Sequence, residues 1–188
     1  VLTSNGSAWT SAAAGGGGTA LISFTEPSAA ASVSLTGFNS TLYGSYFIDF
    51  DIVPSTDNQR LHMRTSTDGG STFDSGAGNY SYGNVALPHG GSVGADGSAS
   101  ATSFSLTNNT TGSAAGESAA GRIIIYAPNL TNNTKFTWNG THQDDGGNET
   151  GEFGTGQRVS AADVDAVQLY FASGNIASGQ VAFYGVLK

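Results

Sequence analysis

Four ionisable side chains near the start of the chain have types and a spacing that suit acid–base chemistry. Asp49 and Asp51 are two residues apart, and His62 and Arg64 repeat that spacing after a polar loop. Residues i and i+2 of a strand point to the same face, so the carboxylates could act as the pair that a glycosidase needs. Opposite-charge pairing between two strands is the simpler interpretation, and each such pair contributes at most ~1 kcal/mol. We favour pairing because the sequence shows no second, separated acid that would complete a catalytic cleft.

A glycine-rich segment, residues 142–152, concentrates acidic side chains. Calcium takes roughly six to eight oxygen ligands, so this segment is a candidate calcium site with Asp144, Asp145, Glu149 and Glu152 as ligands. Its acids lack the D-x-D-x-D-G spacing of an EF-hand loop. A solvated acidic loop is therefore the preferred interpretation, and no cofactor is expected.

Three aromatic residues could form a sugar-binding surface. Tyr80 and Tyr82 alternate on a predicted strand, and Trp138 precedes an Asn-Gly pair. An aromatic face packs on the C–H groups of a sugar, while nearby amides and carboxylates bond its hydroxyls. Aromatic residues also fill sandwich cores or subunit contacts, and this alternative stays open. The candidate receptor-binding residues are Tyr80, Tyr82, Trp138, His142, Asp144 and Asp145.

Residues 90–94 match the G-x-S-x-G pattern of serine hydrolases, with His89 beside them. In a chain with 28 glycines, roughly 0.5 such matches are expected by chance, and the pattern works only on a strand-to-helix elbow. No segment keeps a helical period of apolar residues over several turns. We therefore predict no catalytic residues and no enzymatic activity.

The elements that must position these residues are β-strands. Only 11% of the residues are charged, against roughly 25% in an average soluble domain, and Gly, Ser, Thr and Asn take their place. Such a composition suits strands joined by tight turns. Short runs of β-branched and aromatic residues predict strands at 19–25, 30–36, 45–53, 60–67, 79–86, 101–107, 121–127, 134–140, 164–172 and 179–187.

This strand pattern predicts an all-β fold, namely an antiparallel two-sheet β-sandwich of the jelly-roll kind. Residues 19–188 are expected to form its single domain. Residues 1–18 end in a run of glycines and lack alternation, so they are expected to form an extended linker.

Two hairpins are expected within the sandwich, one over residues 45–67 and one over residues 164–187. In the first, the alternation places Ile52 opposite Leu61. The same register places the charged residues in cross-strand pairs: Asp51 beside His62, and Asp49 beside Arg64.

The net charge of −8, from 6 basic and 14 acidic residues, excludes nucleic acid and anionic membrane surfaces as partners. The longest bulky stretch, residues 122–126, is far shorter than the roughly 18 apolar residues of a membrane span. Membrane insertion is therefore not expected.

Parts of the sequence carry a resemblance to bacteriophage proteins. The opening segment reads VLTSNGSAWTSA and is similar to a linker that joins the shaft of tail-fibre proteins to a C-terminal globular domain. Two longer segments read SYFIDFDIVPSTDNQRLHMRTSTDGGSTFDSGAGNYSY and SGNIASGQVAFYGVLK, and they resemble a β-sandwich domain common in phage virion proteins.

The resemblance implies a virion protein, displayed at the tip of a fibre or spike, that attaches the phage to the host cell surface. It implies a homotrimer that contacts other virion proteins and binds a host glycan or outer-surface protein through loops within residues 87–158. Two alternatives remain: a capsid or tail decoration module that contacts only other virion proteins, and a depolymerase of surface polysaccharide.

Overall fold

The computed structural model describes residues 2–4, 9–11, 18–130 and 132–188 of the chain. All elements of secondary structure within these residues are β-strands, so the predicted all-β class is confirmed. The strands are β1 (Leu2–Ser4), β2 (Trp9–Ser11), β3 (Thr19–Thr25), β4 (Val33–Leu35), β5 (Tyr43–Pro54), β6 (Leu61–Ser66), β7 (Tyr80–Pro88), β8 (Gly94–Ala101), β9 (Phe104–Ser105), β10 (Ala119–Tyr126), β11 (Lys135–Gln143), β12 (Glu149–Arg158), β13 (Ala166–Phe171) and β14 (Ile176–Leu187).

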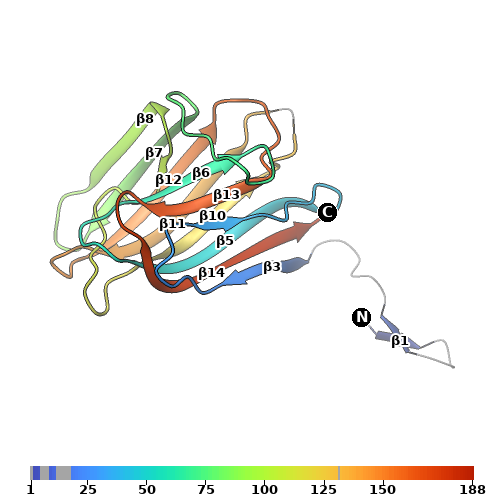
Figure 1. Cartoon of the computed structure of the whole chain (residues 1–188), viewed down its shortest axis with the longest axis horizontal. Coiled ribbons are helices and arrows are strands. Elements are labelled where there is room, and N and C mark those ends of the chain that lie inside the picture. The colour runs from blue at the N-terminus through green and yellow to red at the C-terminus, as the bar shows by residue number, and fades with distance from the viewer. Residues whose placement is uncertain (1, 5–8, 12–17, 131) are drawn as a thin grey trace.

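Two antiparallel sheets pack face to face and confirm the predicted β-sandwich. The large sheet has eight strands in the order β3-β14-β5-β10-β11-β12-β7-β8, and the small sheet has four in the order β4-β13-β6-β9. Figure 1 shows β6 and β13 of the small sheet lying across one face of the large sheet. The opposite face of the large sheet, called here the outer face, carries exposed side chains.

The core lies between the two sheets and is filled by alternate residues of their strands. On β5, Ile48 and Ile52 are 0% exposed, and on β6, Leu61 and Met63 are 0% exposed. Successive side chains of a strand point to opposite faces, so this alternation leaves polar residues outside. Burying each such side chain contributes about 1.5–3 kcal/mol, which holds the sheets together.

The predicted hairpin over residues 45–67 is wrong, although both of its strands exist. β5 pairs with β10 and β14 in the large sheet, whereas β6 pairs with β13 and β9 in the small sheet. The chain therefore arches from one sheet to the other over residues 55–60. Ile52 and Leu61 both face the core, as predicted, but they do so from opposite sheets.

The predicted hairpin over residues 164–187 is wrong for the same reason. β13 belongs to the small sheet, and β14 belongs to the large sheet, where it lies between β3 and β5. An alternating strand has one apolar face whether it continues into a hairpin or into an arch. Alternation alone therefore cannot distinguish the two connections.

Two strands of the large sheet, β8 and β12, fall where the sequence predicts loops. Both are rich in glycine, which normally weakens strands. On β12 the glycines make room for core rings: a Cβ atom on Gly154 would overlap the Trp138 ring, and one on Gly156 would overlap Phe104. Close packing against large aromatic residues thus explains why this strand contains glycine.

Strands β1 and β2 lie within the predicted linker and pair with each other as a separate two-stranded sheet. The other residues of that linker up to residue 17 lie outside the described part of the chain. Strand β3 begins at Thr19, the residue at which the domain is predicted to begin.

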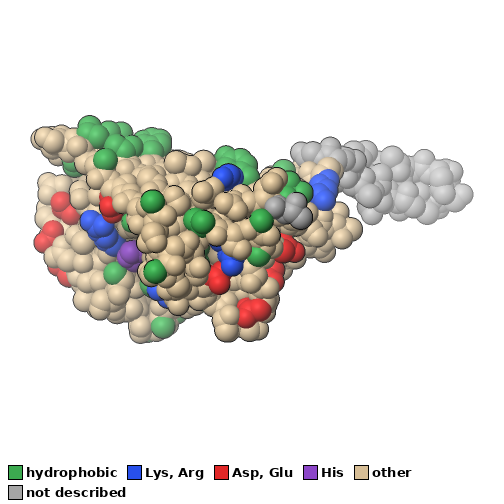
Figure 2. Space-filling view, turned by 90° about the horizontal axis from the view of Figure 1, so that it is seen from above, with side chains coloured by type: hydrophobic (Ala, Val, Ile, Leu, Met, Phe, Trp, Pro, Cys, Tyr) green, Lys and Arg blue, Asp and Glu red, His purple; other side chains and the backbone are tan. Residues whose placement is uncertain are grey.

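The surface matches the composition of the chain. Figure 2 shows a face on which most atoms belong to the backbone or to uncharged polar side chains, with acidic and basic side chains scattered over it. Recognition through this face would rely on hydroxyls and amides more than on charge.

Candidate functional site

Two of the three rings predicted to bind sugar lie in the core. Tyr80 on β7 is 0% exposed, and Trp138 on β11 is 5% exposed. The Tyr80 hydroxyl donates to the carbonyl of Asp74 at 2.9 Å, and the Trp138 indole donates to the carbonyl of Leu106 at 3.0 Å. Tyr82 is half-buried against the core. The core interpretation is thus confirmed for Tyr80 and Trp138, and the prediction that their faces meet a ligand is wrong.

His142 is also buried, where it lies beside one of the predicted calcium ligands. Its Nδ1 atom is 3.6 Å from Oε1 of Glu152, and the side chains are 0% and 2% exposed. The Glu152 carboxylate accepts a hydrogen bond from the backbone N–H of Asn108 at 2.7 Å. Among the described residues, the His142 ring nitrogens and Glu152 Oε2 have no hydrogen-bond partner. Burial raises the pKa of Glu152 to about 7 and lowers the pKa of His142.

The other predicted calcium ligands do not converge with Glu152. Asp144 and Asp145 lie in the turn between β11 and β12, and Glu149 is exposed on β12 while Glu152 points into the core. The Asp144 carboxylate accepts the backbone N–H of Asn148 at 2.8 Å, which lowers its pKa. Within the described ranges, no group of three or more His, Asp or Glu side chains could hold a metal ion.

The predicted charge ladder is split between the two sheets. On the outer face, Asp49 accepts two hydrogen bonds of 2.6 and 2.7 Å from Arg122 of β10. On the small sheet, the His62 ring stacks on Tyr170 with centroids 5.6 Å apart, and the Arg64 guanidinium lies 4.8 Å from the same ring centre. Both predicted pairs are therefore wrong, because β5 and β6 are not neighbours.

The G-x-S-x-G match at residues 90–94 lies at a turn between two antiparallel strands. β7 ends at Pro88 and β8 begins at Gly94, and the backbone N–H of His89 donates to the carbonyl of Glu149 at 2.8 Å. A serine nucleophile of this type needs a strand followed by a helix. The turn does not provide that geometry.

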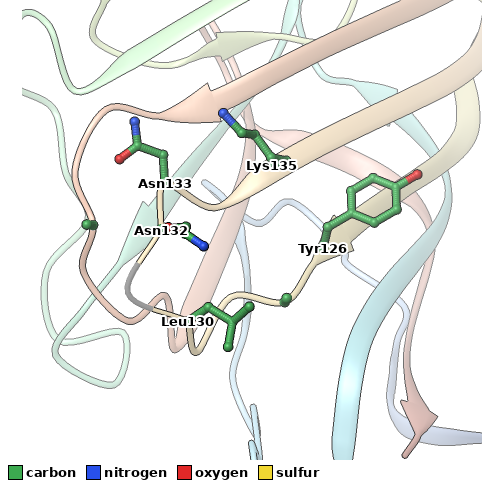
Figure 3. A pocket seen from close by; sticks show the side chains of 7 residues that line it. Tyr126, Leu130, Asn132, Asn133 and Lys135 are labelled. Atoms are coloured by element: carbon green, nitrogen blue, oxygen red, sulfur yellow. The ribbon is translucent and has the colours of Figure 1, made fainter.

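Exposed aromatic and polar side chains gather around a hollow at the turn from β10 to β11, called here the Tyr126 hollow. It has a volume of about 540 Å³, and its lining includes Tyr126, Leu130, Asn132, Asn133 and Lys135. Figure 3 shows the two asparagines on the arm that leads into β11 and Tyr126 on the arm that leaves β10. The ring, amides and ammonium could bind a polar ligand.

Strand register places the Tyr126 hollow at the end of the large sheet where β3 begins and β14 ends. Tyr126 is paired with Ser45, Ser45 with Val186, and Val186 with Thr19. Figure 1 shows the C-terminus and the start of β3 at this same end of the sandwich. A linker that precedes Thr19 would therefore reach the domain on this side.

A second concave region, called here the Asp51 groove, lies toward the opposite end of the outer face. It consists of two adjoining hollows of about 290 and 470 Å³ that share Asp51 and Gln180. The smaller hollow also includes Phe24, Ala182 and Tyr184 in its lining, and the larger includes Glu26 and Glu117.

Three neighbouring strands, β3, β14 and β5, build the smaller hollow. Phe24 and Asp49 both pair with Ala182, so the small Ala182 side chain lies between a ring and a carboxylate. Phe24 is 53% exposed. Alternation brings Tyr184, two residues after Ala182, to the same face.

A stack of side chains fixes the other wall of this hollow. The Tyr184 ring stacks on Phe47 with centroids 4.6 Å apart, and the Arg122 guanidinium lies 4.5 Å from the centre of Phe47. Arg122 is in turn held by its two hydrogen bonds to Asp49, which raise its pKa. The stack orders Tyr184 before any ligand arrives, so less conformational entropy is lost on binding.

In the smaller hollow, Asp51 and Gln180 are the polar groups available to a ligand. They are exposed cross-strand partners on β5 and β14. Neither takes part in the ion pairs formed within the described ranges. A carboxylate and an amide side by side offer both acceptors and donors for ligand hydroxyls.

Of the groove residues, the sequence singles out only Asp49 and Asp51, and it assigns them to the wrong partners. Gln180 and Tyr184 lie about 130 residues from them in the sequence, and Phe24 lies about 25 residues from them. These residues meet because β14 lies between β3 and β5. A sequence search for aromatic residues near amides finds rings close in sequence, such as Tyr80 and Tyr82, and misses rings brought together by sheet order.

No protein-family model, curated protein or solved structure matches the chain. Within the described residues, no helix is long and apolar enough to cross a membrane.

Proposed function

We propose that this chain is a virion module that attaches a phage to its host cell surface, and that the Asp51 groove contacts the receptor. The phage assignment is supported by the sequence resemblance. The groove is supported by its position: exposed ring, carboxylate and amide lie on the part of the outer face remote from Thr19.

The main support for the proposal is the distance between the Asp51 groove and Thr19. Ser45 and Thr19 are at the same level of the sheet, because both pair with Val186. Asp51 lies six residues along β5 from Ser45. At 3.2–3.4 Å per residue this is about 20 Å along the sheet. A domain tethered through the residues before Thr19 would hold the groove away from the shaft, whereas the Tyr126 hollow would face it.

Binding of the labelled full chain to a panel of bacterial strains tests this function. We expect saturable binding to at least one strain, and a marked loss of binding in the double variant Asp51→Ala/Gln180→Ala. Both side chains are exposed, so the fold should be unaffected. Asn139→Ala, which removes another exposed amide of the outer face, is the matched control and should bind normally.

Two outcomes would contradict the proposal. If the chain binds saturably to none of the strains, a decoration module that contacts only virion proteins is favoured. If Asp51→Ala/Gln180→Ala and Asn139→Ala lose binding to the same extent, the receptor contact does not lie specifically in the groove. Shortening of purified surface polysaccharide during incubation with the chain would instead indicate a depolymerase.

A further inference from the structure

We infer that the smaller hollow of the Asp51 groove binds one ring of an uncharged sugar, with Phe24 against its C–H face and Asp51 and Gln180 on its hydroxyls. This inference deepens the proposed function, because it names the chemical class of the receptor at the same site.

The size of the hollow suits a small ligand. Its volume is about 290 Å³, at the lower limit of the roughly 300–1,000 Å³ of pockets that enclose drug-sized molecules. A single pyranose ring is smaller than such a molecule. The adjoining hollow of about 470 Å³ would accommodate the next unit of a chain.

The aromatic surface of the hollow is available and partly ordered. Phe24 is 53% exposed, and no aromatic contact within the described ranges covers its ring. Tyr184 is held against Phe47 by stacking. A flat ring beside the small Ala182 leaves a ledge on which the C–H face of a sugar can pack.

The polar groups fit hydroxyls better than they fit a charged ligand. Asp49 is neutralised by Arg122, so Asp51 supplies the remaining negative charge of the smaller hollow. Glu26 and Glu117 add negative charge in the adjoining hollow and disfavour acidic sugars. A simple cation would leave the Gln180 amide donor without a partner, whereas a pair of adjacent hydroxyls can bond both Asp51 and Gln180.

Ligand-observed NMR on the full chain tests the inference. The probes are the methyl glycosides of glucose, galactose and mannose, with glucuronate and choline as charged comparisons, each in the millimolar range. We expect at least one methyl glycoside to bind and glucuronate and choline to bind more weakly. Phe24→Ala should weaken binding about tenfold, consistent with the loss of one aromatic packing surface.

Phe153→Ala is the matched control, because Phe153 is also 53% exposed but lies on β12, outside the hollow. It should leave the affinity unchanged, and both variants should keep the far-UV circular dichroism of the unmodified chain. Binding of none of the glycosides, preference for glucuronate or choline, or equal effects of the two Phe variants would overturn the inference.

The outcome separates this inference from the proposed function. Cell binding without glycoside binding would support the attachment function but contradict the sugar site, and it would indicate a protein receptor. Glycoside binding without cell binding would leave the sugar site standing and remove the attachment function.

Discussion

Glu152 shows how burial alone changes the chemistry of a residue. It is 2% exposed, receives one backbone hydrogen bond, and has a pKa raised from 4.5 to about 7. In the unfolded chain the same group ionises near its ordinary value, so the folded state binds more protons between these two pKa values. Stability should therefore fall as the pH rises from about 4.5 to about 7.

We expect Glu152→Gln to remove this loss. At pH 8 the variant should be more stable than the unmodified chain by up to about 3 kcal/mol, the value of a shift of this size, and near pH 4 the two should differ little. Urea unfolding measured from pH 4 to pH 8 checks the prediction.

Glu149→Gln is the control, since Glu149 is an exposed carboxylate on the same strand. It should leave the pH profile of the free energy of unfolding unchanged. His142 acts in the opposite direction: burial lowers its pKa, so its contribution is a loss of stability as the pH falls below 6.5. Parallel profiles for Glu152→Gln and the unmodified chain would contradict the prediction.

At the scale of elements, the positions of most strands follow from the sequence, but those of β8 and β12 and the sheet to which each strand belongs do not. β3 begins and ends at its predicted residues, and β5 and β14 extend beyond theirs by a few residues. Each strand's alternation is a local property. Whether the next strand joins the same sheet depends on the path of residues 55–60 and 172–175, which carry no alternation.

Strand β12, one of the two strands that fall where loops are predicted, allows a direct test of its glycines. A Cβ on Gly154 would overlap the Trp138 ring. We expect Gly154→Ala to lower the free energy of unfolding by about 1–3 kcal/mol, because a packed ring must shift. Urea denaturation at neutral pH measures the change.

Gly83 on the neighbouring strand β7 offers the matched comparison. A Cβ there would meet no atom within 4 Å. Gly83→Ala should be neutral or slightly stabilising, because alanine loses less backbone entropy on folding. Equal destabilisation by the two substitutions would show that strand propensity, and not the Trp138 contact, explains the cost.

At the scale of the whole molecule, we expect the proposed attachment to require several copies acting together. Individually weak sites gain avidity when they are tethered to one another. Leu42 precedes Tyr43, and Leu130 lies in the turn that follows Tyr126, so both lie toward the end of the sheet that contains Thr19. They are 50% and 49% exposed, which makes them candidates for a contact between subunits.

We therefore expect the full chain to form a homotrimer of its 18.9 kDa protomer at micromolar concentration. Light scattering coupled to size-exclusion chromatography measures the mass. The double variant Leu42→Glu/Leu130→Glu should shift the mass to that of one protomer, while the double variant Asp51→Ala/Gln180→Ala should remain trimeric. A monomeric unmodified chain would contradict this prediction.

The place of β14 in the sheet has a consequence for how the protein is made. Within the described part of the chain, β3 pairs only with β14, and β14 also pairs with β5. About 150 residues separate β3 from its partner. During synthesis, β3 therefore lacks this partner until β14 leaves the ribosome, roughly 8–30 s later at 5–20 residues per second. The Asp51 groove can therefore form only after β14 has been made.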